Sequence, residues 1–228
     1  MGVKTALLAY VDPGVDVAAL LAAPPPLDRA AARALLERLM PGRAGADAYA
    51  DGTLAGDCYP DARCLCAASW PGFDVVTDRV LAELALSELP ARLVEASRGR
   101  TMFLHCLNST VAMLTFAVWR DGRLVRKLVL SDSDGCIDAS GEPQPFEAPF
   151  WSGERSEARA SDDDEDEDER EADEADEAED ESSPLPFDVF AFSDEALAWS
   201  LGFQLEGPES AFDAHAVPLA MFLRVPRP

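Results

Sequence analysis

The chain has 228 residues, 48% of them hydrophobic, which is enough for one core, and no apolar run approaches the roughly 18 residues that a membrane span needs. Its net charge of -24 is uneven: residues 161–181 hold 16 acids and one arginine, a net of -15, which leaves -9 for the other 207 residues. The remainder is only moderately acidic, which argues against a halophilic surface and against direct nucleic-acid binding.

The N-terminal sequence and the cysteines indicate a compartment. The start, MGVKTALLAYVD, has one lysine and too few apolar residues for a signal peptide, and Ala6 breaks the myristoylation pattern. Five cysteines, an odd number without an export signal, favour reduced thiols. Only two lysines accompany 17 arginines, which suggests a GC-rich bacterial genome. We therefore expect a cytoplasmic protein with no membrane partner.

The first half of the chain predicts alternating strands and helices. Residues 4–10 form a buried strand that ends in the turn Asp12-Pro13-Gly14, and residues 15–22 form a short helix. Asp28 caps a helix that runs to residue 40. Residues 45–61 are irregular except for a short extended piece at 51–54, and strands follow at 64–70 and 73–77. A helix capped by Ser87 ends at Gly99, and residues 101–107 are apolar on both faces, as in a central strand.

Residues 112–131, AMLTFAVWRDGRLVRKLVLS, predict a β-hairpin at the centre of the sheet. A three-residue loop at 120–122 keeps Arg120 from facing Arg123 and pairs Trp119 with Arg123. Leu124 then lies on the apolar face, and so does Arg126, opposite Phe116. A buried guanidinium needs a carboxylate, a carbonyl cluster or a ligand.

Beyond the hairpin, residues 132–141 are expected to be a loop, and the aromatic residues of GEPQPFEAPFW to cover an edge of the core. Residues 152–183 are expected to be a disordered acidic insertion. Ser193 starts the last helix and Gly202 ends it, and residues 217–225 form a strand at the sheet edge because Pro218 cannot donate to a ladder. Residues 1–151 and 184–228 thus make one α+β domain, mainly an antiparallel sheet with flanking helices.

Candidate chemistry is sparse, and each candidate has a structural alternative. His105 and Cys106 point to opposite faces of a strand, so a nucleophilic pair would need Cys64 or Cys66 instead. The cysteines lack the spacing of a structural zinc site, so we expect no metal. The sequence contains no nucleotide-binding or hydrolase fingerprint, so we expect no cofactor.

Carboxylates and one ion pair complete the candidate set. Asp12 and Asp16 flank a turn where carboxylates can hold Mg²⁺, but we favour structural roles, with Asp12 in a Pro-Gly turn and Asp16 as a helix cap. Arg126 with Glu147 is the best candidate pair, as an anion site or as a structural ion pair.

The segments MGVKTALLAY, GRLVRKLVLS and GEPQPFEAPFW, with PLPF downstream, resemble an uncharacterised family of bacterial proteins, mostly from GC-rich genomes. The resemblance implies a β-turn-α start with an Asp-rich turn and a strand like FLHCLNS, but no activity. The chain departs from the family in its acidic run and in Asn108, where a second histidine is expected.

Two functions follow as hypotheses. The first is a non-catalytic protein-interaction domain whose acidic loop attracts a basic protein. The alternative is a small hydrolase or ligand-binding enzyme with a pocket around His105, Arg126 and the 12–16 turn. The enzyme requires these side chains to converge on one cleft, whereas the interaction domain predicts scattered, individually satisfied residues.

Overall fold

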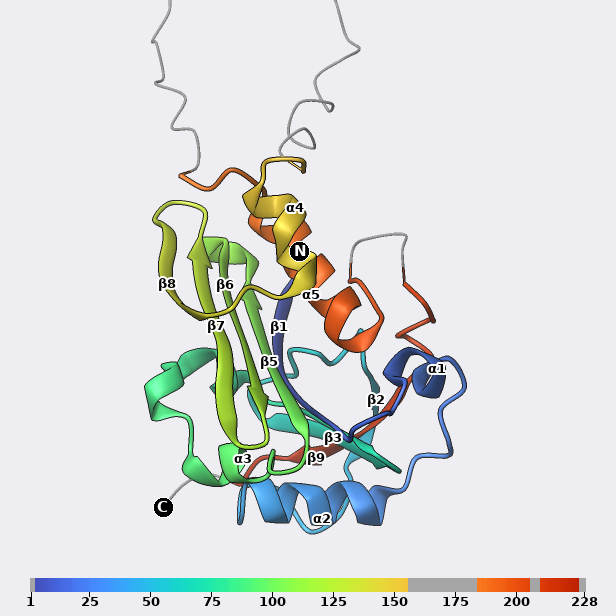
Figure 1. The fold of residues 1–228 in the computed structure, drawn as a ribbon. Coiled ribbons are helices and arrows are strands. Elements are labelled where there is room, and N and C mark those ends of the chain that lie inside the picture. The colour runs from blue at the N-terminus through green and yellow to red at the C-terminus, as the bar shows by residue number, and fades with distance from the viewer. Residues whose placement is uncertain (1–2, 156–183, 206–209, 226–228) are drawn as a thin grey trace, which may run out of the picture.

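The computed structural model describes residues 3–155, 184–205 and 210–225. Within these residues it is mostly sheet with a few helices, the α+β class (Figure 1). The predicted insertion at 152–183 lies outside the described residues from 156 onward, and its first part, 152–155, forms a turn.

The described residues form one sheet of nine strands in the order β2-β9-β3-β4-β1-β5-β6-β7-β8, and every pairing among them is antiparallel. Their bounds are β1 Lys4–Val11, β2 Ala50–Thr53, β3 Cys64–Trp70, β4 Phe73–Thr77, β5 Thr101–Asn108, β6 Met113–Arg120, β7 Arg123–Ser131, β8 Gly135–Gly141 and β9 Pro218–Leu223. The helices are α1 Val17–Ala22, α2 Arg29–Leu39, α3 Ala91–Glu95, α4 Ala148–Trp151 and α5 Val189–Leu201, with 3-10 turns η1 Arg79–Glu83, η2 Leu86–Glu88, η3 Ser109–Val111 and η4 Pro145–Glu147.

Both faces of the sheet are buried, because successive side chains of a strand alternate between them. On the first face, Leu7 and Ala9 of β1 pack in a core shared with α1, α4, α5 and η4. On the second face, Ala6 and Leu8 pack in a core shared with α2, η1 and α3. Helices therefore lie on both sides of the central strands (Figure 1).

The hairpin of β6 and β7 has a different register from the predicted one, and it lies next to the β8 edge rather than at the centre. Asp121 and Gly122 alone form the turn, with φ of 52° and 73°, as a type I′ turn requires. Arg120 consequently faces Arg123, which costs little because both are exposed at the rim. Trp119 therefore pairs with Leu124 and not with Arg123.

A β-bulge at residue 125 then shifts the pairing of β7 with β6 by one residue, so Arg126 faces Val118 instead of Phe116. Arg126 nevertheless remains on the first face of the sheet. Leu124, predicted to lie in the core, is 44% exposed as a result. The prediction that Arg126 is buried is confirmed, since its exposed fraction is 4%.

Three other features of the fold differ from the predictions. The predicted loop at 132–141 contains β8, whose exposed edge position removes the apolar alternation that identifies a strand. Strand β9 lies between β2 and β3 rather than at an edge, and Pro218 is tolerated because it is the first residue of the strand. Helix α3 begins after Pro90, not at Ser87.

Helix α5 begins at Val189, earlier than predicted, because the carboxylate of Asp188 accepts hydrogen bonds from the N–H groups of Phe190 and Ala191. Ser193 is inside the helix and buried. The C-terminus at Gly202, the Asp28 cap of α2, and the bounds of β3 and β4 are confirmed.

Candidate functional site

The turn after β1 holds the two predicted carboxylates, and each has a partner. Asp16 caps α1, where its Oδ1 accepts from the Ala19 N–H at 3.0 Å. Asp12 forms an ion pair with Arg100. Both aspartates therefore have structural roles in the part of the chain that the structure describes.

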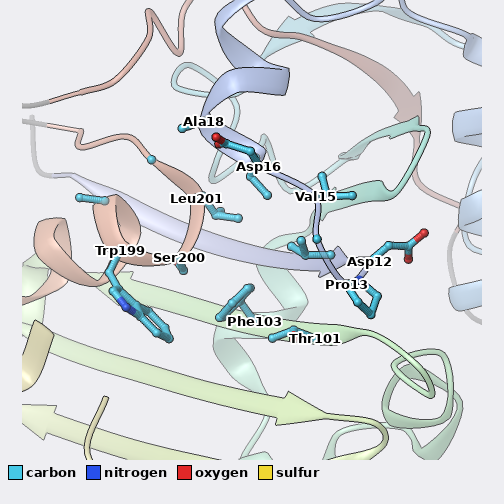
Figure 2. Close-up of a pocket in the computed structure, with 15 residues that line it drawn as sticks. Asp12, Pro13, Val15, Asp16, Ala18, Thr101, Phe103, Trp199, Ser200 and Leu201 are labelled. Carbon is cyan, nitrogen blue, oxygen red and sulfur yellow. The ribbon is translucent and has the colours of Figure 1, made fainter. Parts of the chain in front are cut away.

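A pocket of about 390 Å³ lies beside this turn, between α1, the end of α5 and the strands β1 and β5. Its aromatic wall is Phe103 and Trp199, whose rings are 5.7 Å apart and perpendicular. Figure 2 shows that the Asp12 carboxylate points away from these rings and that the Asp16 carboxylate is directed toward α1. The two carboxylates do not converge, so the predicted Mg²⁺ alternative lacks its ligand pair, and no described group of three or more His, Cys, Asp or Glu is arranged to hold a metal ion.

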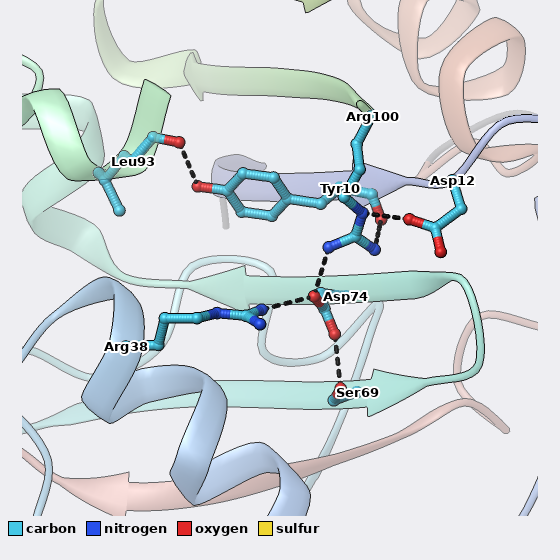
Figure 3. A network of polar contacts seen from close by, with 7 residues as sticks. All are labelled: Tyr10, Asp12, Arg38, Ser69, Asp74, Leu93 and Arg100. Carbon is cyan, nitrogen blue, oxygen red and sulfur yellow. Dashed lines mark hydrogen bonds and ion pairs between the residues drawn. The ribbon is translucent and has the colours of Figure 1, made fainter. Parts of the chain in front are cut away.

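A polar network that the sequence did not reveal lies next to the turn, on the second face (Figure 3). Asp74 of β4, 5% exposed, accepts from Arg38 at 2.9 Å, from Arg100 at 2.6 Å and from the Ser69 hydroxyl at 2.5 Å. Arg100 also donates to the Tyr10 carbonyl at 3.2 Å. The one signal was a lone aspartate within the apolar strand FDVVT.

Tyr10 extends this network toward α3. Its hydroxyl donates to the Leu93 carbonyl at 2.9 Å, and burial raises the pKa of Tyr10 well above its ordinary value. The network thereby ties α2, α3 and the turn to the sheet. The Asp74 carboxylate is satisfied by three hydrogen bonds from within the chain, so its role is structural.

His105 of β5 is 1% exposed and held on both sides. Its Nδ1 lies 2.8 Å from the Thr5 hydroxyl, and its Nε2 lies 3.1 Å from the Ser193 carbonyl of α5. A carbonyl only accepts, so Nε2 carries a proton. Burial lowers the pKa of His105 to about 4, which keeps it neutral at pH 7.

The predicted alternative of a Cys/His nucleophile is wrong for this geometry. Cys106 lies on the second face, opposite to His105, and β4 and β1 separate Cys64 and Cys66, both of β3, from β5. Burial raises the pKa of the Cys66 and Cys106 thiols to about 12, so neither is a thiolate at neutral pH. All five cysteines are free.

Arg126 and Glu147 form a bidentate pair at the other end of the first face. The guanidinium donates to the two carboxylate oxygens at 2.9 and 2.6 Å, and Glu147 is 0% exposed. The carboxylate also accepts from the Gln144 N–H and the Trp151 indole N–H, and the remaining Arg126 nitrogen donates to the Gly141 carbonyl. Each charge is satisfied from within the chain, so the pair fixes η4 and α4 to β7 and β8.

Aromatic contacts join the described residues on either side of the 156–183 gap, next to the Arg126–Glu147 pair. The ring of Phe187 lies 5.3 Å from that of Phe150 and 4.9 Å from that of Trp151. Arg155 donates to Glu195 of α5 at 2.9 Å and lies over the Phe150 ring. We call this set, from residues 147–155 and 184–195, the aromatic clamp.

The predicted residues therefore do not form one cleft. Asp12 and Asp16 line the pocket, whereas His105, Arg126 and Glu147 lie elsewhere in the described chain and are buried. Among the described residues, no helix is long and apolar enough to cross a membrane.

Comparison with known proteins places the chain in a family without an assigned activity. No curated protein and no solved structure matches it. A family of unknown function, DUF6928, matches residues 5–222, which extend from β1 into β9. The chain therefore belongs to the DUF6928 family.

Proposed function

We propose that this chain is a cytoplasmic, non-catalytic binding domain that presents its acidic run, residues 161–181, to a basic protein partner. The observation that carries the proposal is the aromatic clamp, which joins the two ends of the chain that lead into and out of the run. The described residues nearest the run are Arg155, bonded to Glu195 of α5, and Pro184, which lies against Gly135 of β8.

The charge of the run supplies affinity and association rate without a specific sequence. A net charge of -15 in 21 residues attracts cations over a distance of about one Debye length, roughly 8 Å at physiological salt. Such fields accelerate encounter with an oppositely charged protein. Nucleic acids and anionic membranes carry the same sign of charge as the run, so a basic protein is the complementary class of partner.

The geometry supports a binding role over catalysis. A general base must reach the proton that it abstracts, and His105 is closed from solvent with both ring nitrogens bonded. Arg126 and Glu147 neutralise each other. These residues stabilise the domain and offer no reactive group to a substrate.

Binding of a fluorescent oligolysine peptide, followed by anisotropy, tests the proposal. The intact chain should bind it at low salt, and affinity should fall steeply as salt rises. A variant with every acid in 162–181 changed to its amide, at unchanged length, should lose at least about tenfold in affinity. A variant with the same residues in permuted order should bind as the parent does. Equal affinity of the amide variant and the parent would refute the proposal.

A second candidate function keeps part of the enzyme alternative. The pocket beside the 12–16 turn has the size of a small-molecule site and a perpendicular aromatic pair, Phe103 and Trp199. His105 and Arg126 do not line it, so the candidate is ligand binding without their chemistry. Screening small aromatic compounds by Trp199 fluorescence, with Trp199→Phe as the control, tests it.

A further inference from the structure

We infer that the outer edge of β8 is the docking site for an extended basic segment, which adds to the sheet beside β8. The inference rests on the proposed function for the charge of the partner and adds the surface and the backbone conformation that it uses. Figure 1 shows β8 at one margin of the sheet. No other described strand pairs with its outer side.

The backbone of β8 is available for pairing. Residues 136–141 are all exposed, because β7 is the only strand beside β8 in the part of the chain that the structure describes. Alternate residues of an edge strand turn their N–H and C=O groups outward, where an incoming strand satisfies them. Strand addition of this kind takes its affinity from the main chain and its selectivity from alternate side chains.

The usual protections of an edge strand are weak at β8. It is seven residues long and contains neither proline nor lysine. Its one charge, Asp138, is bonded to Lys127 of β7 at 2.5 Å. A single bulge at Ile137 interrupts the pairing, and the 138–141 stretch beyond it pairs regularly with β7. Ile137 leaves its side chain 51% exposed at this edge.

The opposite edge of the sheet is better protected. Strand β2 has only four residues, and its Asp51 forms an ion pair with Arg29 of α2. An incoming strand would gain few backbone hydrogen bonds there. The β8 edge is therefore the longer and less obstructed of the two.

Charge selects a basic occupant for β8 over a second copy of the chain. The exposed carboxylates of Asp134 and Glu142 each lie within a residue of β8, in addition to Asp138, which is paired with Lys127. Pro184, where the described chain resumes after the acidic run, lies against Gly135 at the start of β8. A second copy would bring another charge of -24 to this edge, whereas a segment of alternating basic and apolar residues is attracted to it.

The probe is a fluorescent peptide of alternating lysine and valine, compared with the same peptide N-methylated at every residue. Both carry the same charge, but the second cannot donate its backbone hydrogen bonds. On the intact chain, the N-methylated peptide should bind at least about tenfold more weakly. Amide exchange in residues 135–141 should slow about tenfold when roughly nine in ten molecules carry the parent peptide.

Two substitutions of equal charge separate the edge from the rest of the surface. Ile137→Lys should weaken binding of the parent peptide several-fold, because it places a cation at the edge. Leu223→Lys, at a 47% exposed position on β9, makes the same change away from β8 and should leave binding close to that of the unmodified chain. The exposed thiol of Cys136 gives an independent readout, since bound peptide should slow its alkylation.

The outcomes distinguish this inference from the proposed function. Equal binding of the two peptides, with unchanged exchange in residues 135–141, would overturn strand addition while leaving electrostatic capture intact. Failure of both peptides to bind at low salt would overturn both proposals. A concentration-dependent dimer that protects residues 135–141 would identify a second copy as the occupant and overturn the inference.

Discussion

Replacing Glu147 by glutamine should destabilise the fold far more than replacing Glu147 and Arg126 together with neutral residues. In the single variant, the Arg126 guanidinium stays buried without its counter-charge. Removing one member of a buried pair costs about 3–5 kcal/mol of unfolding free energy, because the remaining ion keeps its desolvation penalty.

The double variant, Arg126→Met with Glu147→Gln, should cost about 1–2 kcal/mol. No charge is left buried, and the amide oxygen of glutamine can still accept from Gln144 or Trp151, the two other donors to Glu147. The cost comes from carbonyls such as that of Gly141, which lose the Arg126 donor. Since each single change costs about 3–5 kcal/mol, the coupling energy between the two positions is then about 4–9 kcal/mol.

Urea unfolding followed by tryptophan fluorescence measures these free energies, since Trp151 contacts Glu147 directly. Arg33→Met with Glu37→Gln is the matched control at an exposed pair, and it should leave the unfolding free energy nearly unchanged. If the two single costs at Arg126 and Glu147 simply add in the double variant, the pair is not coupled and the reasoning is refuted.

Three further predictions concern protonation, reactivity and backbone strain. The pKa of His105 is about 4 in the folded protein, against an ordinary value of 6.5, so unfolding takes up a proton between these pH values. The stability that is present above pH 6.5 therefore declines as pH falls toward 4, by on the order of 3 kcal/mol. His105→Gln should lose less stability over that range in unfolding measurements, and an identical pH dependence would contradict the prediction. Native alkylation should modify Cys136 and spare the four buried cysteines, which mass spectrometry checks against a denatured sample, where all five should react. Gly141→Ala should lower the melting temperature much more than Gly14→Ala. Both glycines have φ near 80°, but a Cβ on Gly141 would lie 2.0 Å from the Val125 carbonyl oxygen, whereas one on Gly14 meets nothing within 4 Å. Equal losses of melting temperature would mean that backbone strain, and not the clash, determines the cost.

Local signals were sufficient where neighbours in the sequence determine the structure. Strands β3 and β4 have the predicted bounds because Pro71-Gly72 marks the turn between them, and α2 begins after Asp28 because that side chain caps it. The need of Arg126 for a carboxylate followed from its place on an apolar face, and the register error did not change that face.

Features set by distant parts of the chain were not predictable in this way. β8 has no apolar alternation, since its position at the edge leaves almost all of it in water. The partners of Asp74 come from α2 and from the residue before β5, and those of His105 come from β1 and α5. Whether Asp12, His105 and Arg126 share one cleft depends on packing between distant segments, which no local sequence pattern specifies. In the structure they do not share one.

The position of β9 makes the order of assembly unusual. Strand β2, formed by residues 50–53, pairs only with β9 among the described strands, and β9 comes from residues 218–223. The N-terminal half of the chain can therefore complete β1, β3 and β4 early, but one edge of β3 stays open until the last strand has been synthesised. Loss of the final dozen residues would remove two strands from the sheet, not one, and would expose the edge of β3 as a site for aggregation.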